Sequence, residues 1–477
     1  MKLKPQLDEF TAAKNMAEIE PPLTGQQAQV ESERCLYCFD APCITACPTG
    51  IDIPGFIKKI ANDNLTGSAK TILEANILGS SCARVCPTSV LCEGACVLLD
   101  RDEMPIKIGQ LQRHATDHVI ENDIQVLKAP EVRSGKKVAL IGGGPASMGC
   151  AAELVLLGHE AVIYEKSPEA GGLNTYGIAY YKLPPRVSLE EVEMIQKLGV
   201  QIECGVEIGK DLSMDELRAD FDAIFLGVGL GNTRSLGVPG EDLPEVTEAL
   251  TFIETFHVSP LHETPVGRHV VVVGCGNTAI DAVTQAKRLG AETATIVYRR
   301  GEEDMPAYRF EYELAKKDGC SFLFHVAPVK VLGEGSVSGL RLIRTQLTAD
   351  GAVEPITGSE FEIPCDMVIK ASGQEKRSNF LQSLCPDLSL DRASRLEVDP
   401  MTRQTSVAGI YAGGDAVNGG REVVNAVAEG KKAARGMHLE FTGETVEGPL
   451  QHTRMGSSRP IGSGFDNPVR VSEAGKS

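Results

Sequence analysis

Short apolar runs alternate with helical patterns through the middle of the chain, and one version of this pattern occurs twice. The first copy has apolar runs at Val138–Ile141 and Ala161–Tyr164 on either side of an apolar helical stretch. The second copy has the same order, with runs at Val270–Val273 and Thr295–Tyr298. Such runs predict buried strands, and their alternation with helices predicts parallel sheets joined by crossover helices.

Each copy carries a glycine-rich turn between its first strand and its helix. The first turn is Gly142-Gly-Gly144-Pro-Ala-Ser147, and the second is Gly274-Cys-Gly276-Asn-Thr-Ala279. The first glycine permits the tight turn, the second lets the backbone approach a pyrophosphate, and a small third residue lets the helix pack on the strand. The helix N-terminus offers free N–H groups to the phosphates. Two such turns in this setting predict two dinucleotide-binding domains.

The residue that ends the second strand separates the roles of the two copies. Glu165 occupies the position that hydrogen-bonds ribose hydroxyls in the first copy. The second copy has Arg299 and Arg300 there, and two guanidinium groups suit a 2′-phosphate. The alternative is that both arginines are solvated surface charges. We expect FAD at the first turn and NADPH, in preference to NADH, at the second.

Two further stretches support an FAD site in the first copy. Gly171-Gly172 follows Glu165 closely and provides a second close approach of the backbone. A strand, a glycine turn and an acid follow one another at Gly409–Asp415, where Asp415 could bind a ribityl hydroxyl. The helix that starts near Val423 would then direct its N-terminus toward the flavin ring.

The cysteines are concentrated near the start of the chain, where eight of the fourteen lie between Cys35 and Cys96. They form two runs, Cys35-x2-Cys38-x4-Cys43-x3-Cys47-Pro48 and Cys82-x3-Cys86-Pro87-x4-Cys92-x3-Cys96. Cysteine followed by proline is typical of ferredoxin-like runs, in which one cysteine ligates the other cluster. We expect iron–sulfur clusters, with structural zinc as the alternative. Counting alone does not assign eight cysteines to two sites.

The remaining six cysteines are single and have apolar neighbours, so we predict buried core thiols. They are Cys150, Cys204, Cys275, Cys320, Cys365 and Cys385.

Composition narrows the possible partners and compartment. The chain has 477 residues, a net charge of −18 and no tryptophan. An acidic surface argues against nucleic acid or an anionic membrane as the main partner. No apolar run approaches the length of a membrane span, and the first ten residues lack the apolar region of a signal peptide. We expect a cytoplasmic protein.

These patterns predict an α/β fold with two Rossmann-like dinucleotide-binding domains behind a mainly α-helical iron–sulfur domain. We expect the NADPH domain to be inserted in the FAD domain. The expected boundaries are 1–130 for the helical domain with two [4Fe–4S] clusters, 131–262 and 377–442 for the FAD domain, 263–376 for the NADPH domain, and 443–477 for a flexible tail.

The motifs together resemble the NAD(P)H-accepting half of dihydropyrimidine dehydrogenase, which in many bacteria is a separate small subunit. The chain is also similar, less closely, to the small chain of glutamate synthase. The resemblance covers about Glu33 to Leu439. The segments that carry it are Cys35–Cys43, Val85–Ser89, Gly142–Ser147, Tyr298–Gly301 and Ala412–Asp415.

The resemblance implies how the two clusters are ligated. Cys35, Cys38, Cys43 and Cys96 would hold one cluster, and Cys47, Cys86 and Cys92 would hold the other with a glutamine as fourth ligand. Gln112 matches the position of that glutamine, and Gln110 is its local competitor. Cys82 would then be no ligand. A neutral glutamine oxygen in place of a thiolate should shift the potential of the cluster.

The candidate nucleotide sites follow from the turns and from the resemblance, which adds Arg309 as a phosphate contact and places Lys182 near the flavin. The expected FAD site comprises Gly142, Gly144, Pro145, Ala146, Ser147, Glu165, Gly172, Leu173, Lys182, Gly414 and Asp415. The expected NADPH site comprises Gly274, Gly276, Asn277, Thr278, Arg299, Arg300, Arg309 and Gly373. Some bacterial pyrimidine subunits have an acid near the position of Arg300, so NADH is the alternative nucleotide. No general acid or base is assigned.

The resemblance implies an electron-input subunit. Hydride would pass from NADPH to the flavin, and single electrons would pass to two [4Fe–4S] clusters and then to an FMN-containing partner that reduces uracil or thymine. The chain has no room for the (β/α)8 barrel of such a partner, so a hetero-oligomer is expected. One alternative is the small chain of an NADPH-dependent glutamate synthase or a related reductase. Another, of a different class, is a redox-sensing iron–sulfur scaffold.

Overall fold

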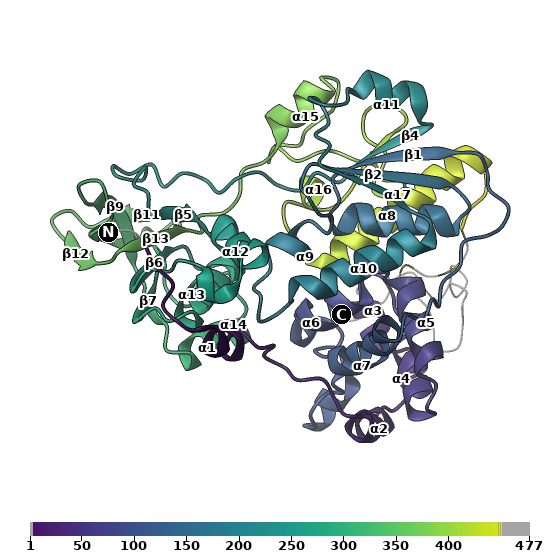
Figure 1. Cartoon of the computed structure of the whole chain (residues 1–477), viewed down its shortest axis with the longest axis horizontal. Coiled ribbons are helices and arrows are strands. Elements are labelled where there is room, and N and C mark those ends of the chain that lie inside the picture. Colours follow the sequence, from purple (N-terminus) through teal and green to yellow (C-terminus); the bar gives the residue numbers. More distant parts are fainter. Residues whose placement is uncertain (1–2, 447, 449, 451–477) are drawn as a thin grey trace. The chain divides into compact units, whose positions relative to one another are not determined.

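The structure is a computed structural model that describes residues 3–446, 448 and 450 as two compact units (Figure 1). One unit contains the residues up to Ile19 together with Tyr176–Pro185 and Gly231–Glu375. The other contains Glu20–Thr175, Arg186–Leu230 and the described residues from Lys376 onward. We call them the NADPH unit and the FAD unit after the nucleotides expected from their turns.

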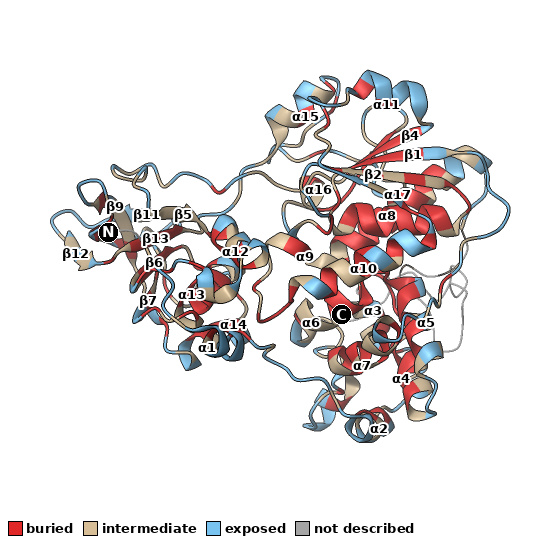
Figure 2. Cartoon of the chain, in the orientation of Figure 1, coloured by how far each residue is buried: buried red, intermediate tan, exposed pale blue. Residues whose placement is uncertain are grey.

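A five-stranded parallel sheet forms the centre of the FAD unit, in the order β14-β4-β1-β2-β3. The strands are β1 (Lys137–Ile141), β2 (Glu160–Glu165), β3 (Gln201–Cys204), β4 (Ala223–Leu226) and β14 (Ile410–Ala412). Helices α8 (Pro145–Leu156) and α17 (Val423–Thr442) pack together and are largely buried beside this sheet (Figure 2). The helices α9 (Leu173–Tyr176), α10 (Pro185–Leu198), α11 (Met214–Asp220), α15 (Ser378–Leu384) and α16 (Asp415–Asn418) complete this fold.

Short helices near the N-terminus form the rest of the FAD unit. They are α2 (Gly25–Glu33), α3 (Pro42–Ala46), α4 (Ile53–Ala61), α5 (Leu65–Ala75), α6 (Gly79–Val85) and α7 (Ile108–Glu121), with 3-10 turns η1 (Thr88–Val90) and η2 (Val97–Arg101). Side-chain caps fix the starts of three of them, since Thr24 accepts from Gln27 N–H, Asp52 from Gly55 N–H and Asn64 from Gly67 N–H. One apolar core joins these helices to the sheet, because Ile57 of α4 and Leu140 of β1 belong to the same buried cluster.

The NADPH unit repeats the architecture with a second parallel sheet, in the order β5-β13-β6-β7-β8. Its elements are β5 (Val246–Glu248), α12 (Ala249–Val258), η3 (Leu261–Glu263), β6 (His269–Val273), α13 (Asn277–Arg288), β7 (Thr293–Val297), α14 (Arg309–Lys317), β8 (Ser321–Leu323) and β13 (Met367–Lys370). A separate small antiparallel sheet contains β9 (Val326–Leu332), β10 (Gly339–Leu347), β11 (Val353–Pro355) and β12 (Phe361–Pro364). Helix α1 (Glu9–Asn15) also belongs to this unit, where Asn15 donates to the Arg288 carbonyl.

The predicted fold class is confirmed, with two parallel sheets and a helical N-terminal part. The expected NADPH segment, 263–376, lies almost entirely in the NADPH unit, which also takes in residues 231–262. The reason is that β5 pairs in parallel with β13 and adds a strand to this sheet. The expected flexible tail at 443–477 lies almost entirely outside the described residues. No helix among the described residues has the length and apolar character needed to cross a membrane.

One prediction about the single cysteines is wrong. Cys150, Cys275, Cys320, Cys365 and Cys385 are buried as expected, whereas Cys204 is exposed. Cys204 is the last residue of β3, and β3 pairs only with β2 at the edge of its sheet. The immediate neighbours of Cys204 in the sequence are Glu203 and Gly205, so the apolar setting assumed for this cysteine was wrong as well.

Candidate functional site

The first glycine turn leaves no room for side chains where a nucleotide would approach. Gly142 has φ +92°, and a Cβ there would lie 2.7 Å from the Gly227 carbonyl oxygen. Gly172 has φ +58°, and its Cβ would lie 2.7 Å from Gly144 Cα. Both positions combine a left-handed backbone with close packing, which only glycine accommodates. The structure thus brings together the two glycine segments that the sequence analysis assigned to FAD.

The start of α8 presents polar groups that the protein itself does not use. Gly144 is the N-cap and provides no side-chain cap, and Pro145 occupies the first turn, so backbone N–H groups remain free for an anion. Nearby, Ser147 and Asn174 are buried, and within the described residues the Ser147 hydroxyl and both polar atoms of the Asn174 side chain have no hydrogen-bond partner. Unpaired buried polar groups and an uncapped helix fit a phosphate-containing cofactor such as FAD.

Glu165 ends β2 and is almost completely buried. Its carboxylate accepts hydrogen bonds from Gly143 N–H at 2.6 Å and from Ser167 N–H at 2.7 Å. These bonds fix the glycine turn against the end of the second strand. A carboxylate has further lone pairs, so a ribose hydroxyl could still donate to it.

The second glycine segment of the FAD unit is held by a residue that the sequence analysis missed. Gly414 has φ +72°, and its N–H donates to Glu429 of α17 at 2.7 Å. Glu429 also accepts from Arg403 at 3.3 Å. Burial raises the pKa of Asp415, which follows this turn. Since Glu429 lies in a helical stretch with no glycine motif of its own, only its placement opposite Gly414 reveals its role.

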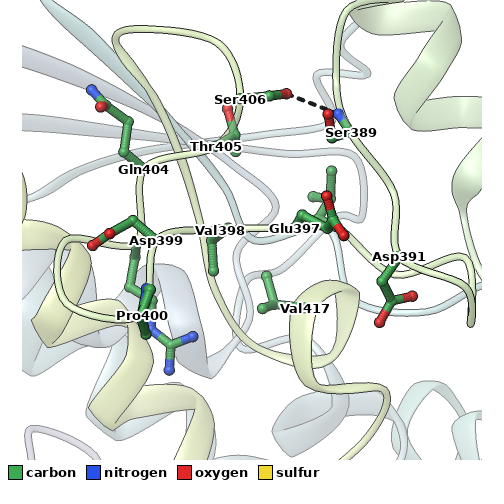
Figure 3. A pocket seen from close by; sticks show the side chains of 12 residues that line it. Ser389, Asp391, Glu397, Val398, Asp399, Pro400, Gln404, Thr405, Ser406 and Val417 are labelled. Carbon is green, nitrogen blue, oxygen red and sulfur yellow. Dashed lines mark hydrogen bonds between the residues drawn. The ribbon is translucent and has the colours of Figure 1, made fainter.

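An open pocket of about 620 Å³ lies in the loops that precede β14 (Figure 3). Three acids line it, but two already stabilise turns, since Asp391 pairs with Arg395 and Asp399 accepts backbone N–H groups from Met401 and Thr402. The pocket contains none of the predicted site residues. We assign it no catalytic role.

The turn of the NADPH unit follows the same design. Gly274 has φ +132°, and a Cβ there would collide with the Ala371 carbonyl. Gly276 is the N-cap of α13 and supplies no side-chain cap, and Asn277 accepts from Tyr308 N–H at 3.0 Å. Thr278 is exposed on the first turn of α13, and Gly373 has φ +89° with open space where a side chain would be. The N-terminus of α13 has no side-chain cap, and Gly373 leaves open space. Both features fit the binding of a pyrophosphate.

Arg299 and Arg300 follow β7 and show no hydrogen bond from their guanidinium groups to the described protein atoms. Their carbonyls are occupied, since Arg299 accepts from the Thr345 hydroxyl and Arg300 from His325 N–H. The backbone is therefore fixed while the guanidinium groups remain available to an anion. Arg309 differs, because it forms ion pairs with Glu302 and Glu313, both at 2.6 Å.

Lys182 lies in the NADPH unit within a buried charge cluster. Its ammonium group lies 2.5 Å from a carboxylate oxygen of Asp281 and 2.5 Å from one of Glu311. The three side chains are each 9% exposed. Burial acts to lower the pKa of Lys182, but the two carboxylates outweigh it and raise the pKa above its ordinary value. The ammonium group expected near the flavin thus bonds to two carboxylates of this unit.

Four cysteines from both runs line one cavity, here called cavity 1. They are Cys35, Cys38, Cys43 and Cys96. Cys43 comes from α3 and Cys96 is the N-cap of η2, so residues more than fifty positions apart meet there. The remaining lining residues are all apolar, including Ile53, Ile57 and Ile108.

The other four cysteines line a second cavity, here called cavity 2. They are Cys47, Cys82, Cys86 and Cys92. Gln112 of α7 lines this cavity, and Gln110 does not. The Gln112 amide nitrogen donates to the Gly79 carbonyl at 2.7 Å, which leaves its oxygen as the free end of the side chain. Cys82 lines the cavity as well, so the geometry offers five candidate ligands.

The chemistry of both cavities fits iron–sulfur clusters. Thiolates are the preferred ligands of such clusters, and each run contributes cysteines to both cavities. Burial raises the pKa of Cys35 to about 11 and that of Cys43 to about 12, so binding of iron must displace protons from these thiols. Within the described residues, no His, Cys, Asp or Glu side chains are grouped to hold a single metal ion.

Two family models match the chain along its length. The model described as dihydropyrimidine dehydrogenase domain II, 4Fe-4S cluster, matches residues 12–124. The model of the pyridine nucleotide-disulphide oxidoreductases matches residues 136–430, more than half of the chain. The cofactors of the chain are accordingly FAD, [4Fe–4S] clusters and NADPH.

Relatives among characterised proteins cover nearly the whole chain. The small chain of glutamate synthase [NADPH] from Halomonas elongata is 36% identical over 90% of this chain and 93% of its own length. The corresponding small chain from Escherichia coli is 37% identical over 88% of this chain and 93% of its own length. The comparisons therefore favour the resemblance that the sequence analysis ranked second, and the closer kinship to dihydropyrimidine dehydrogenase is not confirmed.

Solved structures agree on the fold. The oxidoreductase FprA of Mycobacterium tuberculosis covers 66% of this chain with 20% identity and a TM-score of 0.54, with 87% of its own chain matched. Thioredoxin reductase of T. acidophilum covers 64% of this chain with 20% identity and a TM-score of 0.52, with 99% of its own chain matched. The chain belongs to the pyridine nucleotide-disulphide oxidoreductase family and is an NADPH-dependent FAD and iron–sulfur oxidoreductase.

Proposed function

We propose that the chain is the electron-input subunit of a larger enzyme. Two cavities lined by four cysteines each lie in the same unit as the FAD fold, and this observation carries the proposal. A reductase that delivered hydride directly to a small substrate would need neither cavity. Flavin and clusters together supply the conversion of a two-electron donor into single electrons.

The protein side chains bind and orient these groups. Glu165 and Glu429 hold the two glycine turns of the FAD site through backbone N–H groups. Arg299 and Arg300 bind the 2′-phosphate of NADPH. Cys35, Cys38, Cys43 and Cys96 ligate the cluster of cavity 1, and Cys47, Cys86, Cys92 and Gln112 ligate that of cavity 2. Gln112 is preferred over Gln110 because only Gln112 lines cavity 2.

We infer that the acceptor is a separate catalytic chain of the glutamate synthase type. Both relatives described above are called small chains, and each is matched over 93% of its length. The chain would then function in a hetero-oligomer.

A pyrimidine-reducing FMN subunit is the second candidate for the partner. The position of Gln112 in cavity 2 favours it, since the resemblance to dihydropyrimidine dehydrogenase implied a glutamine ligand. The description of the family model that matches residues 12–124 also names dihydropyrimidine dehydrogenase.

The test begins with the purified chain under anaerobic conditions. Iron and flavin are counted, and reduction of a dye is measured with NADPH and with NADH. We expect one FAD, about eight irons for two four-iron clusters, and a clear preference for NADPH. Zinc in place of iron would overturn the proposal. A fully loaded chain that fails to reduce the dye would instead support a redox-sensing scaffold.

Reconstitution then separates the two partners. The chain is mixed with a glutamate synthase large chain or with a pyrimidine-reducing FMN subunit, and NADPH consumption is followed as glutamate forms or as uracil is reduced. We expect turnover with the first partner only. Turnover with uracil alone would replace the first candidate by the second, and uracil reduction by the unmixed chain would contradict the division into subunits.

A further inference from the structure

One polar side chain in cavity 2 has an unused hydrogen-bond donor. Asn76 lines this cavity, is fully buried, and accepts from Leu78 N–H through Oδ1 at 3.1 Å. A backbone N–H can only donate, so the atom that faces Leu78 must be the amide oxygen. The amide nitrogen Nδ2 therefore points away from Leu78, and it has no partner among the described residues.

A buried donor without a partner destabilises the fold, and native proteins rarely keep one. The side-chain acceptors among the residues that line cavity 2 are the cysteine sulfurs, the Thr88 hydroxyl and the Gln112 amide oxygen. Several other lining residues are apolar, including Ile51, Leu91 and Val424. The proposed function assigns the Gln112 oxygen to the cluster, and among the described residues neither this oxygen nor the Thr88 hydroxyl accepts a hydrogen bond from Asn76 Nδ2. The remaining acceptors are sulfur atoms of the cysteines and of the group that they would ligate.

We propose that Asn76 Nδ2–H donates a hydrogen bond to a sulfur of the iron–sulfur cluster in cavity 2 and thereby raises its reduction potential. Reduction adds negative charge to the cluster, and a hydrogen bond to sulfur stabilises that charge. The inference rests on the assignment of cavity 2 to a cluster in the proposed function. It assigns Asn76 the role of a positioning and tuning residue rather than a ligand.

The protein holds Asn76 firmly at this place. Asn76 is the C-cap of α5, and its own N–H donates to the Ile72 carbonyl at 2.8 Å. The last carbonyls of α5 accept from Lys431 of α17, at 2.7 Å for Glu74 and 3.1 Å for Ala75. Lys431 is buried and is itself paired with Glu153 of α8 at 3.1 Å. Two helices of the FAD fold thus fix the end of the helix that carries Asn76.

Among the residues that the structure describes, cavity 1 has no corresponding side-chain donor. Apart from its four cysteines, every residue that lines it is apolar. The effect of Asn76 should therefore be confined to one of the two clusters. This difference makes cavity 1 an internal reference within the same molecule.

The first measurement is pulsed EPR of the reduced full chain labelled with 15N at asparagine. We expect a hyperfine coupling from one asparagine nitrogen, together with an exchangeable deuteron coupling in D2O. Asn76→Leu and Asn76→Asp should each abolish both couplings. The aspartate variant keeps the acceptor for Leu78 N–H, so it serves where the leucine variant does not fold.

The second measurement is an EPR-monitored redox titration of the same samples. Asn76→Leu, which adds no charge, should make one of the two cluster potentials more negative and leave the other unchanged. The affected potential should be the one that Gln112→Cys also moves. Asn64→Asp is the matched control, because Asn64 caps the exposed start of the same helix and lines neither cavity.

The outcomes separate this inference from the proposed function. Intact clusters whose nitrogen coupling and potentials are the same with and without Asn76 would overturn the hydrogen bond. Equal shifts of both potentials would also overturn it, because they would indicate a general disturbance of the fold. Absence of clusters in the wild-type chain would instead overturn the proposed function.

Discussion

The two dinucleotide-binding folds share a sheet pattern and a glycine turn but differ in the charge at the end of the second strand. In the FAD unit that residue is Glu165, which is buried and accepts two backbone N–H groups. In the NADPH unit the equivalent strand is followed by Arg299 and Arg300, which have fixed backbones and available guanidinium groups. Under the proposed function, the turn provides affinity for a pyrophosphate in both cases and the residue at the strand end selects the nucleotide.

Buried charge also differs between the units. In the FAD unit Glu153 is balanced by two cations, Lys431 and Arg435. In the NADPH unit the order is reversed, and Lys182 pairs with two carboxylates, Asp281 and Glu311. Loss of a single cation should therefore affect the two units unequally.

The largest effect is expected from Lys182→Met. It leaves two buried carboxylates without their cation, so the free energy of unfolding of the NADPH unit should fall by about 3–5 kcal/mol. The raised pKa of Lys182 keeps it charged up to strongly alkaline pH, so the effect should be present at all ordinary pH values. Urea unfolding of the full chain, followed by limited proteolysis of this unit, measures it.

The matched control is Lys431→Met in the FAD unit. Glu153 there keeps Arg435 at 2.7 Å, so the loss of stability should be smaller. An unchanged unfolding curve for Lys182→Met, combined with slower flavin reduction, would contradict the structural role and support the expected position of Lys182 near the flavin.

The next largest effect is expected from replacing Arg299 and Arg300 together by alanine. Loss of two charge-assisted contacts to a 2′-phosphate should raise the KM for NADPH roughly tenfold or more. The KM for NADH should hardly change, because NADH has no such phosphate. Steady-state dye reduction with both nucleotides measures the ratio, and equal losses for both would mean that these arginines do not select the nucleotide.

A smaller effect concerns Glu191 of α10, which accepts from the backbone N–H groups of Ser80 and Ser81 at 2.7 and 3.0 Å. Burial raises the pKa of Glu191 to about 7. The folded chain then binds more protons than the unfolded chain between about pH 4.5 and 7, so stability from this group falls as pH rises through that window. Glu191→Gln should remove a slope on the order of 1 kcal/mol per pH unit within this window.

Stability curves for Glu191→Gln and the wild type, measured at intervals from pH 5 to 8, test this expectation. The difference between them should grow with pH in favour of the variant. Parallel curves would show that the wild-type carboxyl has an ordinary pKa despite its burial.

The smallest effect is expected from Arg309→Ala. Glu302 and Glu313 already pair with this exposed guanidinium group, so the KM for NADPH should change by less than about threefold. The same assay as for Arg299 and Arg300 measures it. A change as large as that of the double variant would restore Arg309 as a phosphate contact.

The sequence by itself determined the local features of this protein. Both glycine turns, the strands that flank them and the charges that end those strands lie within about thirty residues, so their pattern could be interpreted without the fold. The concentration of eight cysteines likewise predicted metal chemistry. The grouping of these cysteines and the choice of Gln112 came from the family resemblance and not from the spacing of the residues.

Only the tertiary structure decided what distant residues do together. It set Glu429 against the Gly414 turn, brought Cys82 into cavity 2 beside the expected ligands, and left Asn76 facing cavity 2 with a free donor. It also exposed Cys204 at a sheet edge, where the sequence predicted burial. The physical reason is common to all of them: periodicity reports which face of an element is buried, and chain topology decides what that face meets.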